Sequence, residues 1–424
     1  NQTQIVYGGG IAVSFLGGMS AAGVGIGGGS LYLPVFIMLA RNRMAIPLAK
    51  SNSLAVSAAT LLINIRRKHP VAERPLTNYD LVLLLEPVTL LGTICGVSLN
   101  ILLPSTAIRV WLVLLLCLLM VLLARIAVSQ YKEETAAKEL AIKQAEERMG
   151  AGSEAPLRGF STASLGSASL RMSGPGGSKT SKRKSKGMTR NELQYELFAA
   201  SNKVLADERG IPWGRISAIA LVALTCYGLE FFSGGGLALF CGSIWQRASL
   251  GVAVLGVIIW TVLYCYRLVH QSKQWTALGV TSQQVYGENL SWGGLSFSMW
   301  LTVAFVAGLA AGSTGVSGGM VKAPFMIQMG ISPTVAAATS NFMVLFTSAS
   351  TTFQYVLLGR IIYQDALVFG AFAFVGAFLG QLAFVKLQER SGRQSFVTFW
   401  LSVEIGLSII CTALSWYLTE EEHW

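Results

Sequence analysis

Two glycine-rich stretches interrupt apolar segments, and they are the parts of the sequence best suited to binding a ligand. They are Gly23–Gly29 and Gly312–Gly319. Glycine lets a chain leave helical geometry, and the next helix then begins with unpaired N–H groups. Those donors and the positive end of the helix dipole bind an anion without a full positive charge. The alternative is close helix packing through small residues. The candidate ligands in these stretches are Gly27, Gly28, Gly29, Ser317, Gly318 and Gly319.

A serine–asparagine pair follows each glycine stretch. The pairs are Ser51-Asn52 and Ser340-Asn341, and Thr339 precedes the second. An amide inside a membrane is costly unless it is paired. Its two donors and one acceptor suit an oxyanion, so we predict that both pairs contribute to a substrate site. The alternative is that each asparagine bonds a neighbouring helix and fixes the packing.

Two lysines lie close to these motifs inside apolar sequence. Lys50 adjoins the first serine–asparagine pair, and Lys322 follows the second glycine stretch. Ionisable groups at such depth are candidates for function, so both are predicted substrate ligands, although either could instead extend to the membrane interface. Glu86, Glu230 and Glu404 also fall in or near apolar runs, and proton coupling through them is open.

The sequence argues against an enzyme. Gly315–Gly318 matches the GxSG pattern of intramembrane serine proteases, but that chemistry needs a base, usually a histidine on a nearby helix. His69, His270 and His423 fall in loops, at span ends or in the tail. The cysteines show no metal-ligand spacing, and no phosphate-binding GxxxxGK[ST] motif occurs. We therefore expect no catalytic residues, no metal and no cofactor.

Composition sets the class of protein that must position these residues. Of 424 residues, 53% are hydrophobic and only 12% charged, whereas soluble proteins average about 25% charged. Mean hydropathy is +0.55. The pattern predicts an all-α, multi-pass integral membrane protein of the plasma membrane or an endomembrane. The net charge of +11 reflects loops and topology, and a nucleic-acid partner is not expected.

Apolar runs define the predicted membrane segments, because a hydrocarbon core of about 30 Å needs about 20 helical residues. Ile5–Ala40 and Trp292–Met329 are too long for one span, and each is expected to form two shorter helices that meet at a glycine stretch. The other predicted spans are Ala45–Ile65, Tyr79–Leu103, Ala107–Ser129, Trp213–Phe232, Leu250–Val269, Pro333–Leu358, Gln364–Leu387 and Gln394–Leu418.

The motifs recur in the same order, which indicates an internal duplication. Gly25–Pro34 aligns with Gly315–Pro324, and Lys50–Leu54 aligns with Thr339–Met343. Five segments per copy and two linking spans make an odd number, so the second copy is predicted to be inverted relative to the first. Arg41 and Arg43, which fall on the non-cytosolic side in this topology, argue against it.

The predicted organisation therefore has four parts. Residues 1–129 form the first membrane repeat, 213–270 form two linking transmembrane helices, and 292–418 form the second repeat. Residues 130–212 are a basic, Ser/Gly/Lys-rich cytosolic insert. Tyr131–Met149 should continue the preceding helix into water, and 150–186 should be disordered. That segment is either a solvated linker or a switch that is phosphorylated or touches anionic lipid.

These motifs resemble the sulfite exporter TauE/SafE family of membrane transporters. The resemblance rests on Gly25–Pro34, its second copy Gly315–Pro324, the Thr339–Asn341 triplet, and the glycines of the third spans at Gly92–Gly96 and Gly370–Gly380. It implies secondary transport of sulfite, organosulfonates or related sulfur-containing anions, most often as export. It does not cover residues 130–212.

The sequence thus predicts an alternating-access transporter of small anions in a lipid bilayer, with the site near the midplane where the motifs converge. Lys50 occupies the position of Thr339 in the other copy, so the two half-sites differ chemically. Two alternatives stay open: an anion channel of the same architecture, and a membrane receptor or scaffold that uses the 130–212 insert. The sequence makes no prediction about the oligomeric state.

Overall fold

A computed structural model describes residues 2–151, 199, 202–204, 206–232, 243–288, 290, 292, 294–391 and 393–421. Every extended element in these ranges is an α-helix, and a single bridge between Lys68 and Pro75 closes one loop. The predicted all-α fold is therefore confirmed. Residues 152–198, which hold most of the basic insert, lie outside the described ranges.

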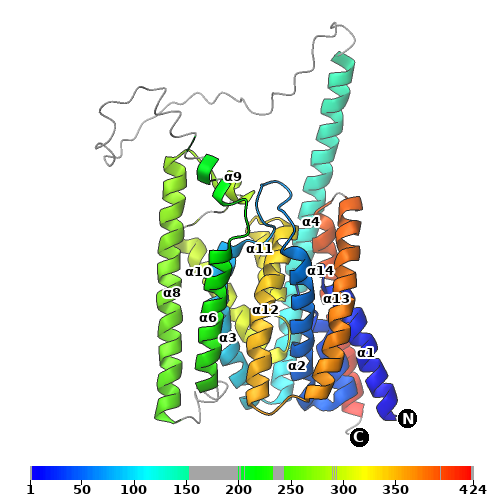
Figure 1. Ribbon diagram of the computed structural model, residues 1–424. Coiled ribbons are helices and arrows are strands. Elements are labelled where there is room, and N and C mark those ends of the chain that lie inside the picture. Colours follow the sequence, from blue (N-terminus) through cyan, green and yellow to red (C-terminus); the bar gives the residue numbers. More distant parts are fainter. Residues whose placement is uncertain are drawn as a thin grey trace.

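The helices form an upright bundle in which both the start of α1 and the end of α14 lie at one end (Figure 1). We call residues 2–151 the first half and 294–421 the second half. The first half contains α1 (Gln2–Ala21), α2 (Gly29–Asn64), α3 (Tyr79–Leu102) and α4 (Ser105–Ala151). Between the halves lie α6 (Trp213–Phe232), α8 (Ile244–Ala277) and α9 (Ser282–Tyr286). The second half contains α10 (Gly294–Thr314), α11 (Gly319–Gln328), α12 (Pro333–Leu357), α13 (Tyr363–Ser391) and α14 (Ser395–Glu421).

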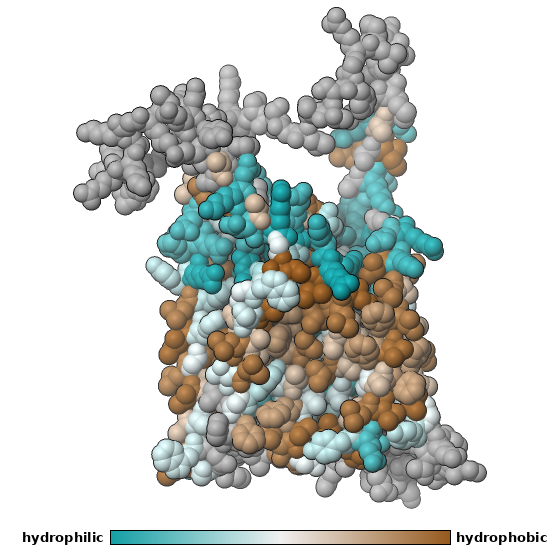
Figure 2. Space-filling view, viewed as in Figure 1, coloured by the Kyte–Doolittle hydropathy of each residue, from teal (hydrophilic) through white to brown (hydrophobic). Residues whose placement is uncertain are grey.

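The surface of the bundle is that of a multi-pass membrane protein. Seven segments in the described ranges are long and apolar enough to cross a membrane. Figure 2 shows a broad hydrophobic belt capped by hydrophilic residues at the end where α9 lies. Large apolar side chains such as Leu118 and Leu367 are exposed on this belt. The seven are Ala45–Asn64, Tyr79–Leu102, Thr106–Glu146, Arg247–Ala277, Ser296–Thr314, Tyr363–Ser391 and Ser395–Ser415.

Helix α12 lies in the middle of the bundle but is not one of the seven. Its buried face carries polar side chains, among them Ser348, Thr351 and Gln354. These lower its hydropathy below that of a lipid-facing span. A helix with so many buried polar groups must bond within the protein, which is the arrangement expected around a polar path.

Helix α2 folds back on itself. Gly29 and Ser53 are 24 positions apart, which corresponds to about 36 Å along a straight helix. A Cβ at Gly29 would nevertheless lie 3.2 Å from the Ser53 hydroxyl oxygen. The reversal therefore lies between them, in a stretch that contains Pro34 and Pro47. Helical geometry continues through the bend, so α2 joins the second part of the Ile5–Ala40 stretch to the predicted Ala45–Ile65 span, which matches the candidate span Ala45–Asn64.

The first helix of each half packs against the third span of the other half. Gly10 on α1 abuts Phe369 on α13, and further along both helices Gly18 abuts Ala373, so α1 and α13 run in the same direction. Gly92 and then Gly96 on α3 abut successive turns of α10, so these two helices also run in the same direction. Because α3 and α13 run in opposite directions, α1 and α10 do too (Figure 1).

Helix α4 runs well past the end of the hydrophobic belt (Figures 1 and 2). At the edge of the belt Glu134 on α4 accepts hydrogen bonds from the backbone N–H groups of Gln394 and Ser395, each at 2.9 Å. This carboxylate caps the start of α14 and interacts favourably with the positive end of its helix dipole. The last helices of the two halves are thereby fixed to each other.

The glycine seam as a candidate anion site

Each half contains a non-helical break between its first two helices. In the first half Gly25, Gly27 and Gly28 have φ values of +82°, +64° and +72°. In the second half Gly315 has φ +77°. Side chains with a Cβ rarely adopt such angles, so the glycines are what allows the chain to stop one helix and start the next at this depth. We call residues 22–29 and 315–319 together the glycine seam.

The two breaks touch each other backbone to backbone. A Cβ at Gly29 would lie 2.9 Å from the Gly315 carbonyl oxygen and 2.9 Å from the Ser317 nitrogen. A Cβ at Gly319 would collide with the Gly25 carbonyl oxygen. Any larger residue would push the halves apart. The sequence predicted that the breaks converge, and the structure places them in direct contact. The contact is closed, with no space between these backbones.

Polar side chains from each half hold the break of the other half. Lys50 on α2 donates from Nζ to the Val316 carbonyl oxygen at 2.7 Å. In return, Asn341 on α12 donates from Nδ2 to the Ala22 carbonyl oxygen at 3.0 Å. These carbonyls lie outside helices, so each needs a donor from elsewhere once it is buried. The seam is thus a joint in which each half satisfies the backbone of the other.

Two serines complete this joint. Ser340 donates to the Gly25 carbonyl oxygen at 2.7 Å, which is a second bond from α12 to the first break. Ser317 accepts a hydrogen bond from the Gly319 nitrogen at 3.3 Å, so its hydroxyl lies at the start of α11. Both serines are buried.

The remaining predicted ligands face away from the seam. Thr339 accepts a hydrogen bond from the Asn78 nitrogen at 3.0 Å, which anchors the start of α3. Ser51 donates to the Leu48 carbonyl oxygen of its own helix at 2.9 Å. Asn52 donates from Nδ2 to the Ser14 hydroxyl on α1 at 2.8 Å. Ser53, the residue after Asn52, does reach the seam, because its hydroxyl oxygen would lie 3.2 Å from a Cβ at Gly29.

Both asparagines keep one buried oxygen unused. Asn52 Oδ1 and Asn341 Oδ1 have no hydrogen-bond partner among the described residues. An unpaired buried acceptor costs about 1–3 kcal/mol, so such groups are rare in packed cores. Asn341 also lines a small crevice with Asn64 and Arg67 that has room for about one water molecule. These oxygens are acceptors, so they suit a water molecule or another donor, whereas an anion would need the Nδ2 donors that now bond Ser14 and Ala22.

The two buried lysines differ in their partners. Lys322 forms an ion pair with Glu86 on α3 at 2.9 Å, and Thr347 also donates to Glu86 at 2.6 Å. Lys50 is only 1% exposed and has no carboxylate within ion-pair distance among the described residues. The Glu86–Lys322 pair was not predicted. The sequence shows that Glu86 and Lys322 both lie in apolar segments, but nothing in their spacing shows that they meet.

Two further buried carboxylates lie outside the seam. Glu230 on α6 accepts a hydrogen bond from Ser350 at 2.6 Å, and Glu404 on α14 accepts one from Ser20 at 3.2 Å. Each has a second oxygen without a partner among the described residues. Neither contacts Lys50 or Lys322, so they are not part of the joint between the breaks.

A hydrophobic belt, helices that cross it and a buried polar joint at the meeting of two broken helices define an integral membrane protein of the transporter class. The sulfite exporter TauE/SafE family model matches residues 10–175 and 197–407. The chain belongs to this family of membrane transporters. No solved structure matches it significantly.

Related proteins match along nearly the whole chain. Sulfite exporter TauE/SafE family protein 3 of Arabidopsis thaliana is 25% identical over 413 residues, which cover 96% of this chain and 77% of the relative. Family protein 1 of the same plant is 27% identical over 410 residues, covering 93% and 80%. The probable membrane transporter protein YunE of Bacillus subtilis (strain 168) is 26% identical over 129 residues, covering 28% and 44%.

Proposed function

We propose that this protein is a secondary transporter of small sulfur-containing anions, such as sulfite or an organosulfonate, and that the glycine seam is its substrate site. The observation that carries the proposal is the reciprocal joint: Lys50 holds the break of the second half, and Asn341 holds the break of the first. A substrate between the breaks would replace these contacts, so binding and movement of the halves are coupled.

Lys50 supplies the charge that such a site needs. A buried ammonium group is costly without a counter-ion, and a single carbonyl oxygen only partly compensates for that cost. An anion in the seam would neutralise Lys50 and accept its hydrogen bond in place of Val316. Lys322 is already neutralised by Glu86, so we assign first contact with the substrate to Lys50.

The opposite directions of α1 and α10 support an inverted pair of repeats, and alternating access follows from that symmetry. In the closed seam the two backbones are in van der Waals contact. Rocking one half against the other would open the seam to one side and then to the other. The Gly25–Pro34 and Gly315–Pro324 segments would then be equivalent hinges of the two halves.

Proton coupling is a natural extension of this mechanism. Protonation of Glu86 would remove the counter-ion of Lys322, leaving a second cation at the seam. The Lys322 Cε atom lies 3.7 Å from where a Cβ at Gly318 would be, so its ammonium group reaches the break without moving far. Anion binding would then be favoured when Glu86 is protonated, and the anion would move together with a proton.

The test is flux in reconstituted vesicles, with labelled sulfite, sulfate and taurine and with or without a pH gradient. Loss of the Lys50 ammonium removes a charge-assisted hydrogen bond worth about 1.5–3 kcal/mol, so Lys50→Gln should lower sulfite flux about 10- to 100-fold. Lys386→Gln removes an equally charged but exposed side chain from α13 and should leave flux unchanged. Asn52→Ala and Asn341→Ala should abolish flux at unchanged expression, the first by removing the bond to Ser14 on α1 and the second by removing the bond to the Ala22 carbonyl oxygen.

Flux that survives Lys50→Gln at the level of the unsubstituted protein would contradict the assignment of the seam. Single-channel currents in a planar bilayer would contradict alternating access, because a carrier gives none. An effect of the protein on cells that persists in Asn341→Ala, with no flux in either protein, would favour the receptor or scaffold alternative.

A further inference from the structure

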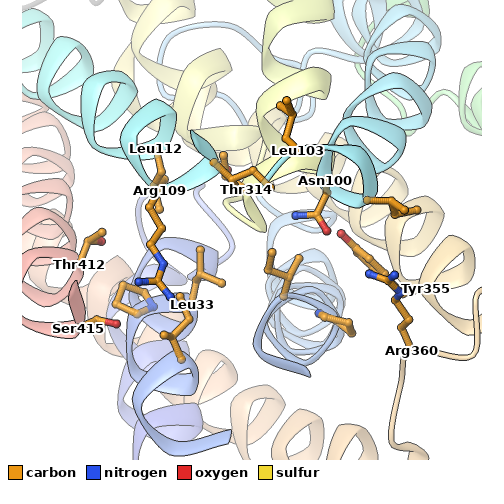
Figure 3. Close-up of a pocket in the computed structure, with 16 residues that line it drawn as sticks. Leu33, Asn100, Leu103, Arg109, Leu112, Thr314, Tyr355, Arg360, Thr412 and Ser415 are labelled. Atoms are coloured by element: carbon orange, nitrogen blue, oxygen red, sulfur yellow. The ribbon is translucent and has the colours of Figure 1, made fainter. Parts of the chain in front are cut away.

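A cavity of about 500 Å³ is lined by residues that lie toward the end of the bundle where α4 and α13 begin (Figure 3). It is bounded by the bend of α2, the ends of α3, α12 and α14, and the start of α4. Figure 3 shows Arg109 and Arg360 on opposite sides of it, with Asn100, Tyr355 and Thr314 nearby. None of these belongs to the seam.

The polar groups of the cavity are suited to an anion. Among the described residues, Arg109 and Arg360 are the charged side chains that line it, and no aspartate or glutamate of these residues does. Arg109 already has an interaction partner, so Arg360 is the guanidinium group whose substitution tests the cavity. Arg360 is exposed at the rim and Arg109 is half-buried. Guanidinium groups match the geometry of sulfonate, sulfate and carboxylate oxygens. The cavity therefore attracts oxyanions from solution before they meet the transport machinery.

Much of the remaining wall is apolar, although Thr412 and Ser415 of α14 also line the cavity. The apolar part consists largely of aliphatic side chains and prolines on both sides of the α2 bend, namely Leu33, Pro34, Ile37, Ile46 and Pro47. A bare inorganic anion gains nothing from such a wall. An organic anion gains the transfer free energy of its hydrocarbon part, worth up to about fourfold in affinity for each methylene buried. The combination suits a short alkyl chain with one anionic head.

The deep end of the cavity leads to the seam. Asn100 donates to the Ser313 carbonyl oxygen at 2.7 Å, and Tyr355 donates to the Gly312 carbonyl oxygen at 3.3 Å. Both bonds hold the end of α10, directly before the second break. The cavity thus ends where the glycine seam begins.

Two aliphatic side chains form the layer between cavity and seam. A Cβ at Gly315 would lie 3.1 Å from Ile46 Cγ2 and 3.4 Å from Leu33 Cδ1. Both residues also line the cavity. They come from the two arms of the α2 bend, so a change in that bend would move them apart.

We infer that this cavity is a recruitment site for organic oxyanions with a short apolar tail, and that Leu33 and Ile46 are the gate between it and the seam. Passage beyond the gate rests on the function proposed above. Binding in the cavity does not, so the two are tested separately.

Protection of an introduced thiol measures occupancy without any transport. Leu103 is 44% exposed and lines the cavity, so Leu103→Cys should react with a maleimide, measured against the background of the native cysteines. Methanesulfonate, propanesulfonate and butanesulfonate should slow this reaction. The half-protecting concentration should fall about threefold for each added methylene. Sulfate should protect least.

Arginine variants in the Leu103→Cys background test the electrostatic part. Arg360→Gln should raise the half-protecting concentration of butanesulfonate at least threefold, and Arg360→Lys should raise it less. Arg247→Gln is the matched control, because Arg247 is exposed at the start of α8, at the same end of the bundle, and does not line the cavity. It should change nothing.

The outcomes separate the two proposals. Protection by butanesulfonate that is unaffected by Arg360→Gln, or equally affected by Arg247→Gln, overturns the recruitment site, and so does a lack of protection by every sulfonate. Lys50→Gln should lower sulfite flux about 10- to 100-fold and leave protection intact. If flux survives Lys50→Gln while protection follows Arg360, the seam assignment fails and the recruitment site stands.

Discussion

Lys50 and Lys322 are residues of the same type at similar burial, and their partners give them different tasks. Lys322 is neutralised by Glu86, whereas Lys50 bonds only a carbonyl oxygen. Lys322 belongs to an ion pair that is part of the fold, whereas Lys50 has no carboxylate partner among the described residues. The difference depends on a contact between α3 and α11, and the local sequence of either lysine does not contain it.

Removing one member of the Glu86–Lys322 pair should destabilise the protein strongly. Lys322→Met leaves Glu86 buried without its ion partner, at a cost of about 3–5 kcal/mol. The double substitution Lys322→Met with Glu86→Leu removes both charges and should recover most of that loss. Thermal unfolding midpoints of the purified proteins measure this, and equal midpoints for the single and double variants would contradict the pair's role.

The sequence specifies the position of some predicted site residues, whereas the position of others depends on how the helices pack. The sequence predicted Gly27, Gly29 and Gly319 at the breaks, and the structure places them there, while their role as ligands stays a prediction. Thr339 was expected beside the substrate and instead anchors Asn78. Neighbouring positions on a helix point in different directions, and which face meets the seam depends on packing between the halves.

At the scale of elements, the seam depends on helices that approach closely at some glycines and not at others. Gly319 is pressed against the Gly25 carbonyl and lies 2.7 Å, measured from an added Cβ, from the Ser340 oxygen. Gly370 on α13 has only the Ala55 methyl group at 3.8 Å. Both belong to the motifs that carry the family resemblance, but only one is sterically required in this conformation.

Alanine at these two glycines should therefore have opposite effects. Gly319→Ala should force the breaks apart, lowering both the thermal midpoint and the flux of labelled sulfite. Gly370→Ala fits the space and gains helix propensity of up to about 1 kcal/mol, so it should leave flux unchanged and raise the midpoint slightly. Similar behaviour of the two variants would show that glycine acts here through something other than contact.

The elements themselves were largely predictable, since apolar runs of the right length set their bounds. The exception is α2. Its sequence predicted two separate segments, whereas its backbone stays helical through a reversal that brings Gly29 to Ser53. The prolines and the length of the apolar sequence indicate a bend near Pro47. The direction of the bend is set by the helices packed around it.

At the scale of the whole molecule, each half packs its first helix against a helix of the other half. The α1 helix packs against α13, and α10 packs against α3, so neither half has a complete core by itself. The inverted relation of the halves stays a prediction from charge and segment number, supported by the opposite directions of α1 and α10. Whichever way the protein is inserted, one face of the molecule lies on each side of the membrane.

Those faces make the topology testable. Glu73 is exposed in the loop between α2 and α3, and Gln364 is exposed at the start of α13 at the other end of the bundle. With the basic Arg66–Lys68 loop in the cytosol, Glu73→Cys should react with an impermeant thiol reagent only after the membrane is opened. Gln364→Cys should react in intact cells or sealed organelles. The reverse pattern would place the recruitment cavity on the cytosolic side.

Transport through the seam is tested most directly by locking it. A Cβ at Gly27 would lie 3.6 Å from Ser317 Cβ, within the range of a disulfide. Gly27 has a φ of +64° and a Cβ there would lie 2.8 Å from Val344 Cγ1, so the reduced variant Gly27→Cys with Ser317→Cys should have lower flux than the unsubstituted protein. Oxidation should abolish the labelled-sulfite flux of this reduced variant and reduction should restore it, while each single variant is insensitive to oxidant. Undiminished flux through the fully cross-linked protein would contradict the account, because an anion would then cross without the two breaks separating.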